Sequence, residues 1–356
     1  MTDFKGRRLG MNRIFRIFLY LIVFGLVAGS LITFILWKRV FAPNITTGQV
    51  ETFYLYIPTG TSYAEVMDLL DENNLVENMS SLEWVAVRKN YPNRVRPGKY
   101  RLTDGMSNNQ LINMLRSGGQ VPVKLVFNNL RTLNDIASVV SMQIEADSSS
   151  IAELAMNVEF IESIGFDTVS LPAMFIPNTY EIYWNTSAEQ FYRRMKDEYD
   201  RFWNNRRQNK LQAIGLDRHE VSTLASIVIE ETVKYDEMPV IAGVYLNRLE
   251  RGMLLQADPT VKFALGDLTV RRILRADLQI DSPYNTYKYA GLPPGPIVIP
   301  PVQAIDAVLD AQNHDYIFFS AKEDFSGYHR FAKTLSEHNR NARLYQNALN
   351  RQRVFR

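Results

Sequence analysis

A long apolar run near the start of the chain limits what its first forty residues can form. Ile17 to Trp37 contains 21 residues and no charge. A helix of that length rises about 1.5 Å per residue and crosses a hydrocarbon core of about 30 Å. A cleaved signal peptide is disfavoured because the run is too long and lacks an A-x-A cleavage site. We therefore predict a membrane-spanning helix over residues 17–37.

Positive charge is unequal on the two sides of this run. Five basic residues precede it, and only Lys38 and Arg39 follow it closely. The positive-inside rule then predicts that the tail, residues 1–16, is cytoplasmic. Everything after residue 38 is predicted to lie on the periplasmic or extracellular side of the cell (inner) membrane. The chain is thus expected to be a single-pass membrane protein.

The composition argues against several kinds of partner and cofactor. The formal net charge is +2, of which the tail contributes +4 through five basic residues and one acidic residue. The remainder carries −2, which argues against nucleic-acid binding. The chain has no cysteine, its four histidines lack zinc-binding spacing, and it has no Walker or dinucleotide-binding motif. We therefore expect no metal and no cofactor.

The segment after the apolar run is predicted to form a linker and then a small α+β module. Residues 38–49 include a Pro/Asn/Thr/Gly stretch typical of a linker. Residues 52–57 alternate like a strand, and residues 96–102 form a second strand. Three capping boxes, each a Ser followed three residues later by Glu or Gln, predict helix starts at Ser62/Glu65, Ser80/Glu83 and Ser107/Gln110. The module, predicted over residues 50–120, therefore contains a βααβ unit.

This βααβ unit, with its Pro-Gly-Lys-Tyr100 turn, resembles the LysM-like module that binds N-acetylglucosamine polymers. A rigid spacer that lifts the next domain off the membrane is the alternative. The remaining chain, residues 121–356, is predicted to be a mixed α+β domain that begins with a strand over 121–127 and a helix over 132–142. The predicted fold class is α+β.

A later helix places one carboxyl group among apolar residues. Leu224, Ile227, Val228 and Glu231 follow an i, i+3, i+4, i+7 spacing. A carboxyl group half-buried on such a face loses water, so its pKa should rise and make Glu231 a general acid near neutral pH. The alternative is a frayed helix end at which Glu231 reaches solvent or an arginine. Glu230 lies about 100° round the helix, which makes it the weaker candidate.

Six segments, in order over residues 175–297, together resemble one enzyme family. They are Phe175-Ile-Pro-Asn-Thr-Tyr-Glu181, the helix ending in Glu231-Thr232, Val244-Tyr-Leu-Asn-Arg-Leu249, Leu255-Gln-Ala-Asp-Pro-Thr-Val261, Ser282-Pro-Tyr-Asn-Thr-Tyr287 and Gly291-Leu-Pro-Pro-Gly-Pro-Ile297. The chain closely resembles the endolytic murein transglycosylases, the YceG-like or MltG-like family, including their membrane anchor and LysM-like module. The catalytic domain is then expected over residues 121–356.

The resemblance implies a lyase reaction on peptidoglycan. Such enzymes cleave the β-1,4 bond between N-acetylmuramic acid and N-acetylglucosamine within glycan strands. One glutamic acid, here Glu231, protonates the glycosidic oxygen and later removes the proton of the muramic acid C6 hydroxyl, which closes a 1,6-anhydro ring. The partners implied are glycan strands and the synthases that polymerise them, and the role implied is to limit the length of new strands. Ile229 and Glu230 depart from the family's usual acidic residue and lysine, so local charge near the acid could differ.

Other candidate binding residues come from the same segments. Gln256, Asp258 and Thr260 follow Gly252, a predicted helix stop, so we expect them on a loop or strand that faces a ligand. Asn285 and Tyr287 are suited to hydrogen-bond and stack on sugars, and Tyr180 is a further candidate. Structural alternatives are a turn at Asp258 and a buried turn at Tyr180.

Two functions from other classes remain open at this point. A membrane-anchored scaffold would bind glycan without cutting it. A muramidase would use water and need a second carboxylate, for which Asp258 and Glu181 are the candidates. The ends left on the cleaved glycan distinguish all three functions.

Overall fold

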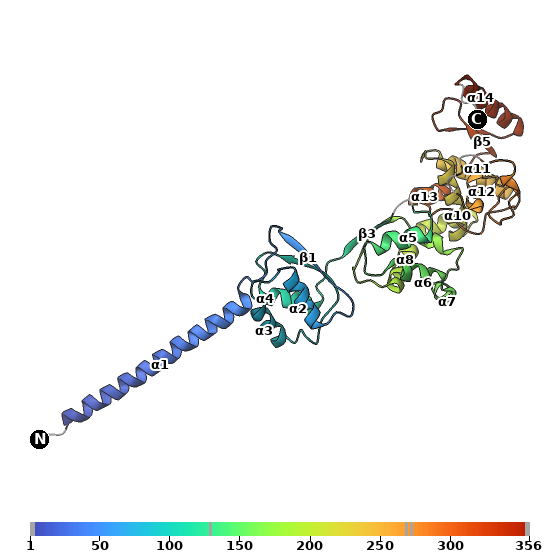
Figure 1. Ribbon diagram of the computed structural model, residues 1–356. Helices are drawn as coiled ribbons and strands as arrows, with labels where there is room; N and C mark the ends of the chain where they lie inside the picture. Colours follow the sequence, from blue (N-terminus) through green and yellow to red (C-terminus); the bar gives the residue numbers. More distant parts are fainter. Residues whose placement is uncertain (1–3, 128–129, 268–269, 271–272, 353–356) are drawn as a thin grey trace. The chain divides into compact units, whose positions relative to one another are not determined.

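The protein is a mixed α+β structure, as predicted (Figure 1). The computed structural model describes residues 4–127, 130–267, 270 and 273–352, with side chains from Phe15 onward. The chain divides into two compact units. The first unit is Met1–Val123 with Tyr183–Asn185, and the second is Lys124–Ile182 with Thr186–Arg356. The domain boundary predicted between residues 120 and 121 stays a prediction, because compact units need not coincide with functional domains.

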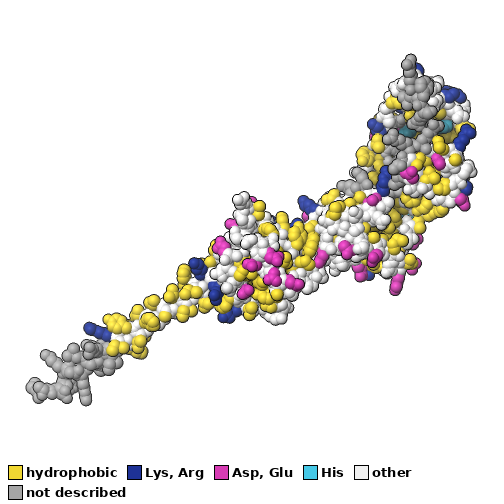
Figure 2. Space-filling view, viewed as in Figure 1, with side chains coloured by type: hydrophobic (Ala, Val, Ile, Leu, Met, Phe, Trp, Pro, Cys, Tyr) yellow, Lys and Arg dark blue, Asp and Glu magenta, His cyan; other side chains and the backbone are white. Residues whose placement is uncertain are grey.

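Helix α1 (Phe4–Phe41) contains the apolar run. Its stretch Phe15–Phe41 is long and apolar enough to cross a membrane, by length and composition. Hydrophobic side chains cover the visible face of the described part of this helix (Figure 2), and the span is not buried inside the protein. This exposure distinguishes α1 from the core helix of a soluble protein.

The first unit packs helices against a two-stranded sheet. After α1 its elements are β1 (Thr52–Ile57), α2 (Tyr63–Glu72), α3 (Met79–Arg88), β2 (Gly98–Thr103) and α4 (Asn108–Ser117). Strands β1 and β2 are antiparallel, with Leu55 opposite Tyr100, and both side chains are buried in one core with residues of the three helices. The predicted βααβ order is confirmed, and the LysM-like character of the unit stays a prediction.

Two of the three predicted capping boxes are confirmed. Ser62 caps α2 and Ser107 caps α4, each with the reciprocal bond from the third helical residue. The box predicted at Ser80 is wrong, because α3 begins two residues earlier, at Met79. Its cap is Asn78, whose side chain accepts the backbone N–H of Ser81 at 2.9 Å. The amide oxygen of Asn78 therefore does what the Ser80 hydroxyl was expected to do.

The residues predicted to form a linker are packed into the first unit. Ile45 is 2% exposed and belongs to its core. The Asn44 side chain donates to Asn108 Oδ1 at 2.6 Å and accepts the backbone N–H of Asn78 at 2.9 Å. Asn108, which is 1% exposed, donates to the carbonyl of Arg39 near the end of α1 at 2.9 Å. This network joins the end of α1 to α3 and α4.

The second unit is mostly helical. Its first elements are β3 (Val123–Phe127), α5 (Leu133–Ser141), α6 (Ser148–Met156), α7 (Val158–Ser163), the 3-10 helix η1 (Leu171–Met174), β4 (Asn178–Ile182), α8 (Ala188–Phe202) and α9 (Asn205–Ile214). The later elements are α10 (Arg218–Glu231), α11 (Met238–Glu250), α12 (Asp258–Leu265), the 3-10 helix η2 (Asp277–Gln279), α13 (Val302–Leu309), β5 (Phe318–Ala321), β6 (His329–Ala332) and α14 (Leu335–Arg351). Strand β3 pairs with β4, and β5 pairs with β6. The strand and helix predicted near residues 121–142 are confirmed as β3 and α5.

Helix α10 lies among α11, α12 and α13, which Figure 1 shows grouped together. It begins with a capping box in which Asp217 and Glu220 exchange bonds with each other's backbone N–H. Every residue from 221 to 228 is buried, so this part of α10 is covered all round rather than amphipathic as predicted. The helix ends at Glu231 as predicted, and Thr232 follows it with extended backbone angles.

Helix α11 is held close to the loop between α13 and β5. Asn247 donates to the carbonyls of His314 and Tyr316 at 2.6 and 2.9 Å. Arg248 is 7% exposed and donates to the carbonyl of Ile317 at 2.7 Å. Gly243 allows this approach, because a Cβ there would lie 2.5 Å from the carbonyl oxygen of Gln312. The position of α11 against this loop therefore depends on a glycine.

We predict that Gly243→Ala destabilises the second unit. Alanine favours a helix by about 1 kcal/mol over glycine. Its Cβ would nevertheless clash with backbone, where overpacking typically costs about 1–3 kcal/mol, so the expected net loss is up to about 2 kcal/mol. Urea unfolding of the chain in detergent measures it. The control is Gly119→Ala, whose Cβ would meet its nearest atom at 3.4 Å; an equal effect of the two changes would contradict the close approach.

Candidate active site

Glu231 is the last residue of α10 and follows its buried segment. Leu224, Ile227 and Val228 are fully buried, and Glu231 itself is half-buried. The three apolar residues of the predicted stripe are buried, although they belong to a segment that is buried all round, and the half-buried Glu231 is not at a frayed end. Burial raises the pKa of Glu231 to about 7, because the charged carboxylate loses water.

Glu231 also has specific electrostatic partners. The hydroxyl of Tyr245, in α11, donates to Glu231 Oε1 at 2.8 Å, and this bond opposes the rise of the carboxyl's pKa. The negative charge of Asp258 raises the pKa of Glu231, whereas Lys262 and Arg248 lower it. Burial is the largest of these effects. The carboxyl can therefore both give and take a proton near neutral pH.

Glu230 faces a different partner. Its carboxylate pairs with Arg131 at 3.0 Å, in the segment before α5. Glu230 is not among the groups that shift the pKa of Glu231. The sequence-based choice of Glu231 over Glu230 agrees with this geometry, and the suggested tuning by Glu230 has no support in it.

Three of the predicted binding residues lie near Glu231 or on the loop beside it. Gln256 is exposed on that loop, with a left-handed φ of 52° that non-glycine residues rarely adopt. Asp258 is exposed at the start of α12, and the Tyr287 hydroxyl donates to its Oδ1 at 2.6 Å. Asp258 and Glu231 both raise the pKa of Tyr287 after burial, which is the main cause. These exposed polar groups are in a position to meet a ligand.

Thr260 and Asn285 support that loop from the inside. Thr260 was expected on a loop or strand, but it lies in the first turn of α12, fully buried, because Pro259 favours a helix start there. Its hydroxyl lies 2.8 Å from that of Thr286. Asn285 is also fully buried and donates to the carbonyls of Leu278 and Ile280 at 3.0 and 2.8 Å. Neither side chain has an exposed atom for a sugar contact.

Tyr180 is part of the core of the second unit. It lies in β4 with 6% exposure, packs on Phe127 with ring centroids 5.5 Å apart, and donates its hydroxyl to the carbonyl of Ile176. Its neighbour Glu181 is exposed on the same strand. Neither is among the groups that shift the pKa of Glu231. The structure therefore favours the buried-turn interpretation of this segment over a ligand contact.

A cavity of about 340 Å³ opens beside Glu231. Thr232 and Val233 line it from the end of α10, and Lys322, Tyr328 and His329 line it from the β5–β6 hairpin. This volume is at the lower end of the range of roughly 300–1,000 Å³ usual for small-molecule sites. The acid is thus accessible to a ligand on one side while its helix is buried on the others.

Sequence reasoning missed several contacts of this site. Tyr245 lies in a segment recognised only for its resemblance to a family, and Glu237 and His329 were not connected at all. Glu237 is 5% exposed, and its Oε2 lies 2.7 Å from His329 Nδ1. A buried glutamate next to a helix start was the one available signal, but its partner is 92 residues away.

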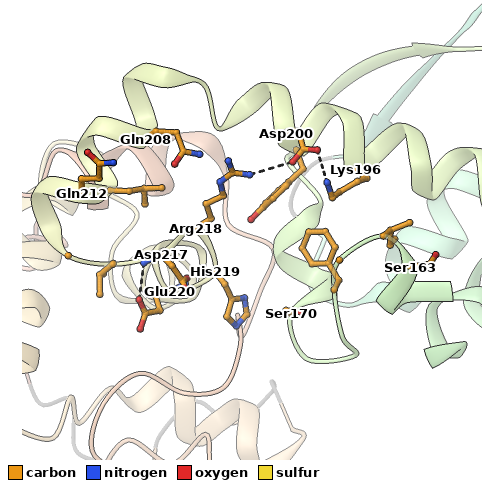
Figure 3. Close-up of a pocket in the computed structure, with 17 residues that line it drawn as sticks. Ser163, Ser170, Lys196, Asp200, Gln208, Gln212, Asp217, Arg218, His219 and Glu220 are labelled. Atoms are coloured by element: carbon orange, nitrogen blue, oxygen red, sulfur yellow. Dashed lines mark hydrogen bonds and ion pairs between the residues drawn. The ribbon is translucent and has the colours of Figure 1, made fainter. Parts of the chain in front are cut away.

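A larger cavity, of about 1180 Å³, lies at the other end of α10 (Figure 3). Its charged side chains pair with each other: Asp200 accepts from Arg218 at 3.4 Å and from Lys196 at 2.6 Å. Arg218 and Glu231 are separated by the length of α10, about 20 Å. The smaller cavity therefore remains the candidate active site, because it holds the carboxyl group with the raised pKa.

The Pro-rich segment after residue 290 packs along α10. The backbone N–H of Ile297 donates to Ser226 Oγ at 3.0 Å, and the carbonyl of Pro294 bonds His219 Nε2 at 2.7 Å. A Cβ on Gly295 would lie 2.5 Å from the carbonyl of Val169. These contacts give the segment a packing role in the second unit.

A half-buried carboxyl group with a raised pKa, open to a cavity in a mixed α+β unit, is a candidate acid–base site. Comparison with known proteins identifies the family. The chain belongs to the YceG-like family, whose model matches residues 55–344.

Its relatives include curated enzymes and a solved structure. The endolytic murein transglycosylase of Bacillus subtilis is 29% identical over 319 residues, which are 84% of this chain and 86% of the relative. That of Streptococcus pneumoniae is 29% identical over 82% of this chain, and the match spans 58% of the longer relative. A crystal structure of a YceG-like protein from Listeria monocytogenes, 29% identical, matches with a TM-score of 0.54 over 82% of this chain and 98% of that one.

The raised pKa of Glu231 predicts that this carboxyl lowers the stability of the fold above neutral pH. Between the ordinary value of 4.5 and about 7, the folded chain binds more protons than the unfolded chain. The free energy of unfolding therefore falls as pH rises through this range, by about 3 kcal/mol in total. Glu231→Gln cannot ionise, so its stability relative to wild type should be about 2 kcal/mol greater at pH 8 than at pH 5. Urea unfolding at both pH values measures this; the same difference at both would contradict the shift.

Proposed function

We propose that this protein is an endolytic lytic transglycosylase, a carbon–oxygen lyase that cleaves the β-1,4 bond between N-acetylmuramic acid and N-acetylglucosamine within peptidoglycan strands. The observation that carries the proposal is the carboxyl of Glu231, half-buried beside a cavity with a pKa of about 7. Membership of the YceG-like family and the names of the Bacillus and Streptococcus relatives supply the substrate class.

The proposed reaction uses Glu231 twice. Tyr245 donates to Oε1, so the other oxygen, Oε2, is the one that carries the proton. Glu231 gives this proton to the glycosidic oxygen as the bond to C1 of muramic acid breaks, through an oxocarbenium-like transition state. The C6 hydroxyl oxygen then bonds C1, and the Glu231 carboxylate takes the hydroxyl proton. The acid is regenerated, and the product end is a 1,6-anhydro ring.

The surrounding residues have separate roles in this proposal. The exposed side chains of Gln256 and Asp258, with the half-buried ring of Tyr287, bind the sugars on one side of Glu231. The buried Thr260 and Asn285 keep their loop in place. The difference in solvent exposure between these residues supports this division of roles, since a side chain must reach solvent to contact a polymer.

The same proposal includes a location and partners. Helix α1 anchors the chain in the cell (inner) membrane, with the tail in the cytoplasm and the catalytic unit on the other side. The first unit is proposed to be LysM-like, and its glycan contact is part of the proposal. Peptidoglycan synthases are proposed as partners, because an enzyme held at the membrane meets new strands as they are made and limits their length.

We predict that Glu231→Gln abolishes cleavage of purified peptidoglycan. General acid catalysis contributes about 10²–10⁴-fold, so the rate should fall at least about 100-fold. Mass spectrometry of the ends made by the full chain in detergent should show muramic acid one water lighter than a reducing end. Glu230→Gln is the matched control, because Glu230 pairs with Arg131. Reducing ends from wild type would instead identify a muramidase, and folded wild type that binds glycan without cutting it would identify a scaffold.

The pKa of Glu231 also predicts the pH dependence of the rate. The acid must be protonated, so kcat/KM should fall as pH rises through about 7. Tyr245→Phe removes a bond that lowers the pKa of Glu231, and this alkaline limb should move to higher pH. Asp258→Asn removes a charge that raises the same pKa, and the limb should move to lower pH. A pH–rate profile of each variant measures the shift, with Glu230→Gln as control. If the alkaline limbs of Tyr245→Phe and Asp258→Asn moved in the same direction, the assigned partners would be contradicted.

A further inference from the structure

The cavity beside Glu231 contains an ionisable side chain that the proposed reaction does not yet use. His329, the first residue of β6, lines this cavity together with Glu231 and Thr232. Its side chain is 14% exposed. Both side chains therefore line the space in which a ligand of this cavity would lie.

Glu237 fixes the orientation of the His329 ring. Its Oε1 accepts the backbone N–H of His329 at 2.7 Å, and its Oε2 accepts Nδ1–H at 2.7 Å. Thr232, the residue after Glu231, donates its hydroxyl to Glu237 Oε2 at 3.3 Å. Because Glu237 is buried, this carboxylate depends on these donors and holds the ring in one position.

The second ring nitrogen of His329 is left for a ligand. Within the described part of the chain, Nε2 makes no hydrogen bond, unlike Nε2 of His314, which bonds the carbonyl of Val240 at 2.9 Å. His219 likewise uses its Nε2 on the carbonyl of Pro294. Since Glu237 accepts the proton on Nδ1, the neutral ring presents a lone pair at Nε2. Such a nitrogen accepts a hydrogen bond from a hydroxyl group.

We propose that His329, held by Glu237, orients the C6 hydroxyl of the muramic acid at the cleavage point. This inference rests on the proposed transglycosylation, in which that hydroxyl must attack C1 before water does. While Glu231 is still protonated, His329 Nε2 accepts the hydrogen bond of the hydroxyl and orients its oxygen towards C1. Once Glu231 has given its proton to the glycosidic oxygen, the hydroxyl turns its O–H bond to the Glu231 carboxylate, which takes the proton as the C6 oxygen bonds C1. His329 is thus a substrate-positioning residue for ring closure, and Glu237 positions His329.

Product partition tests this role directly. Asparagine at position 329 keeps a donor for Glu237 in the place of Nδ1 but removes Nε2. We expect His329→Asn to lower kcat about 10- to 100-fold with little change in KM, because the nucleophile is misoriented. We also expect the share of reducing ends to rise, since water captures the intermediate that the C6 hydroxyl misses. A residue with a purely structural role would not change this ratio.

Two further variants complete the experiment on the full chain in detergent. Glu237→Gln keeps the shape but presents an amide to Nδ1, which favours the wrong tautomer, so it should shift the ratio in the same direction. Arg330→Gln is the matched control, because Arg330 follows His329 on β6 and pairs with Glu323 outside the cavity. It should leave the rate and the ratio unchanged.

The outcomes separate this inference from the proposed function. Wild type that forms no 1,6-anhydro ends overturns the transglycosylase proposal, and the role of His329 with it. Wild type that forms them, with an unchanged ratio and rate in His329→Asn, overturns only the role of His329. Loss of folding in both His329→Asn and Glu237→Gln, seen in thermal melts, would also overturn that role by assigning the pair to the core.

Discussion

The site depends on the contact between α10 and α11, which sets two opposing effects on one carboxyl group. Burial at the end of α10 disfavours the charge on Glu231, and the hydroxyl of Tyr245 from α11 favours it. Burial without this bond would raise the pKa of Glu231 further, and a solvated carboxyl would stay near its ordinary value. The proposed catalysis by a single group needs a pKa between these limits, because the same carboxyl group must release a proton and recover it. The spacing of two helices therefore controls the proton affinity of the acid.

Local patterns in the sequence predicted the parts of the structure that local physics determines. The end of α10 at Glu231 and the caps at Ser62 and Ser107 depend on residues within one or two helical turns. The cap of α3 was missed because Asn78 is held by Asn44, 34 residues earlier in the chain. No spacing rule connects residues so far apart, since their contact exists only after the unit has folded.

In the candidate site, too, local sequence patterns could not predict which residues contact one another. Sequence resemblance identified the loop from Gln256 to Asp258 but could not separate residues that face a ligand from those that hold the loop. Thr260 and Asn285 are polar for the second reason, because a buried loop backbone needs hydrogen-bond partners. Glu237 and His329 remained unconnected because they meet from a helix start and a strand 92 residues apart. Exposure and pairing, rather than residue type, decide these roles.

The buried asparagines of the first unit have a consequence for how the chain meets a bilayer. Asn108 bonds the carbonyl of Arg39, so the last turn of α1 is tied directly to the first unit. A helix whose apolar length exceeds the bilayer thickness tilts to fit, at a cost of fractions of a kcal/mol per Å of mismatch. With no free linker at this junction, such a tilt would be passed on to the first unit as a rotation. In the proposed membrane location, the lipid composition around α1 would then help to set the tilt of that unit relative to the bilayer.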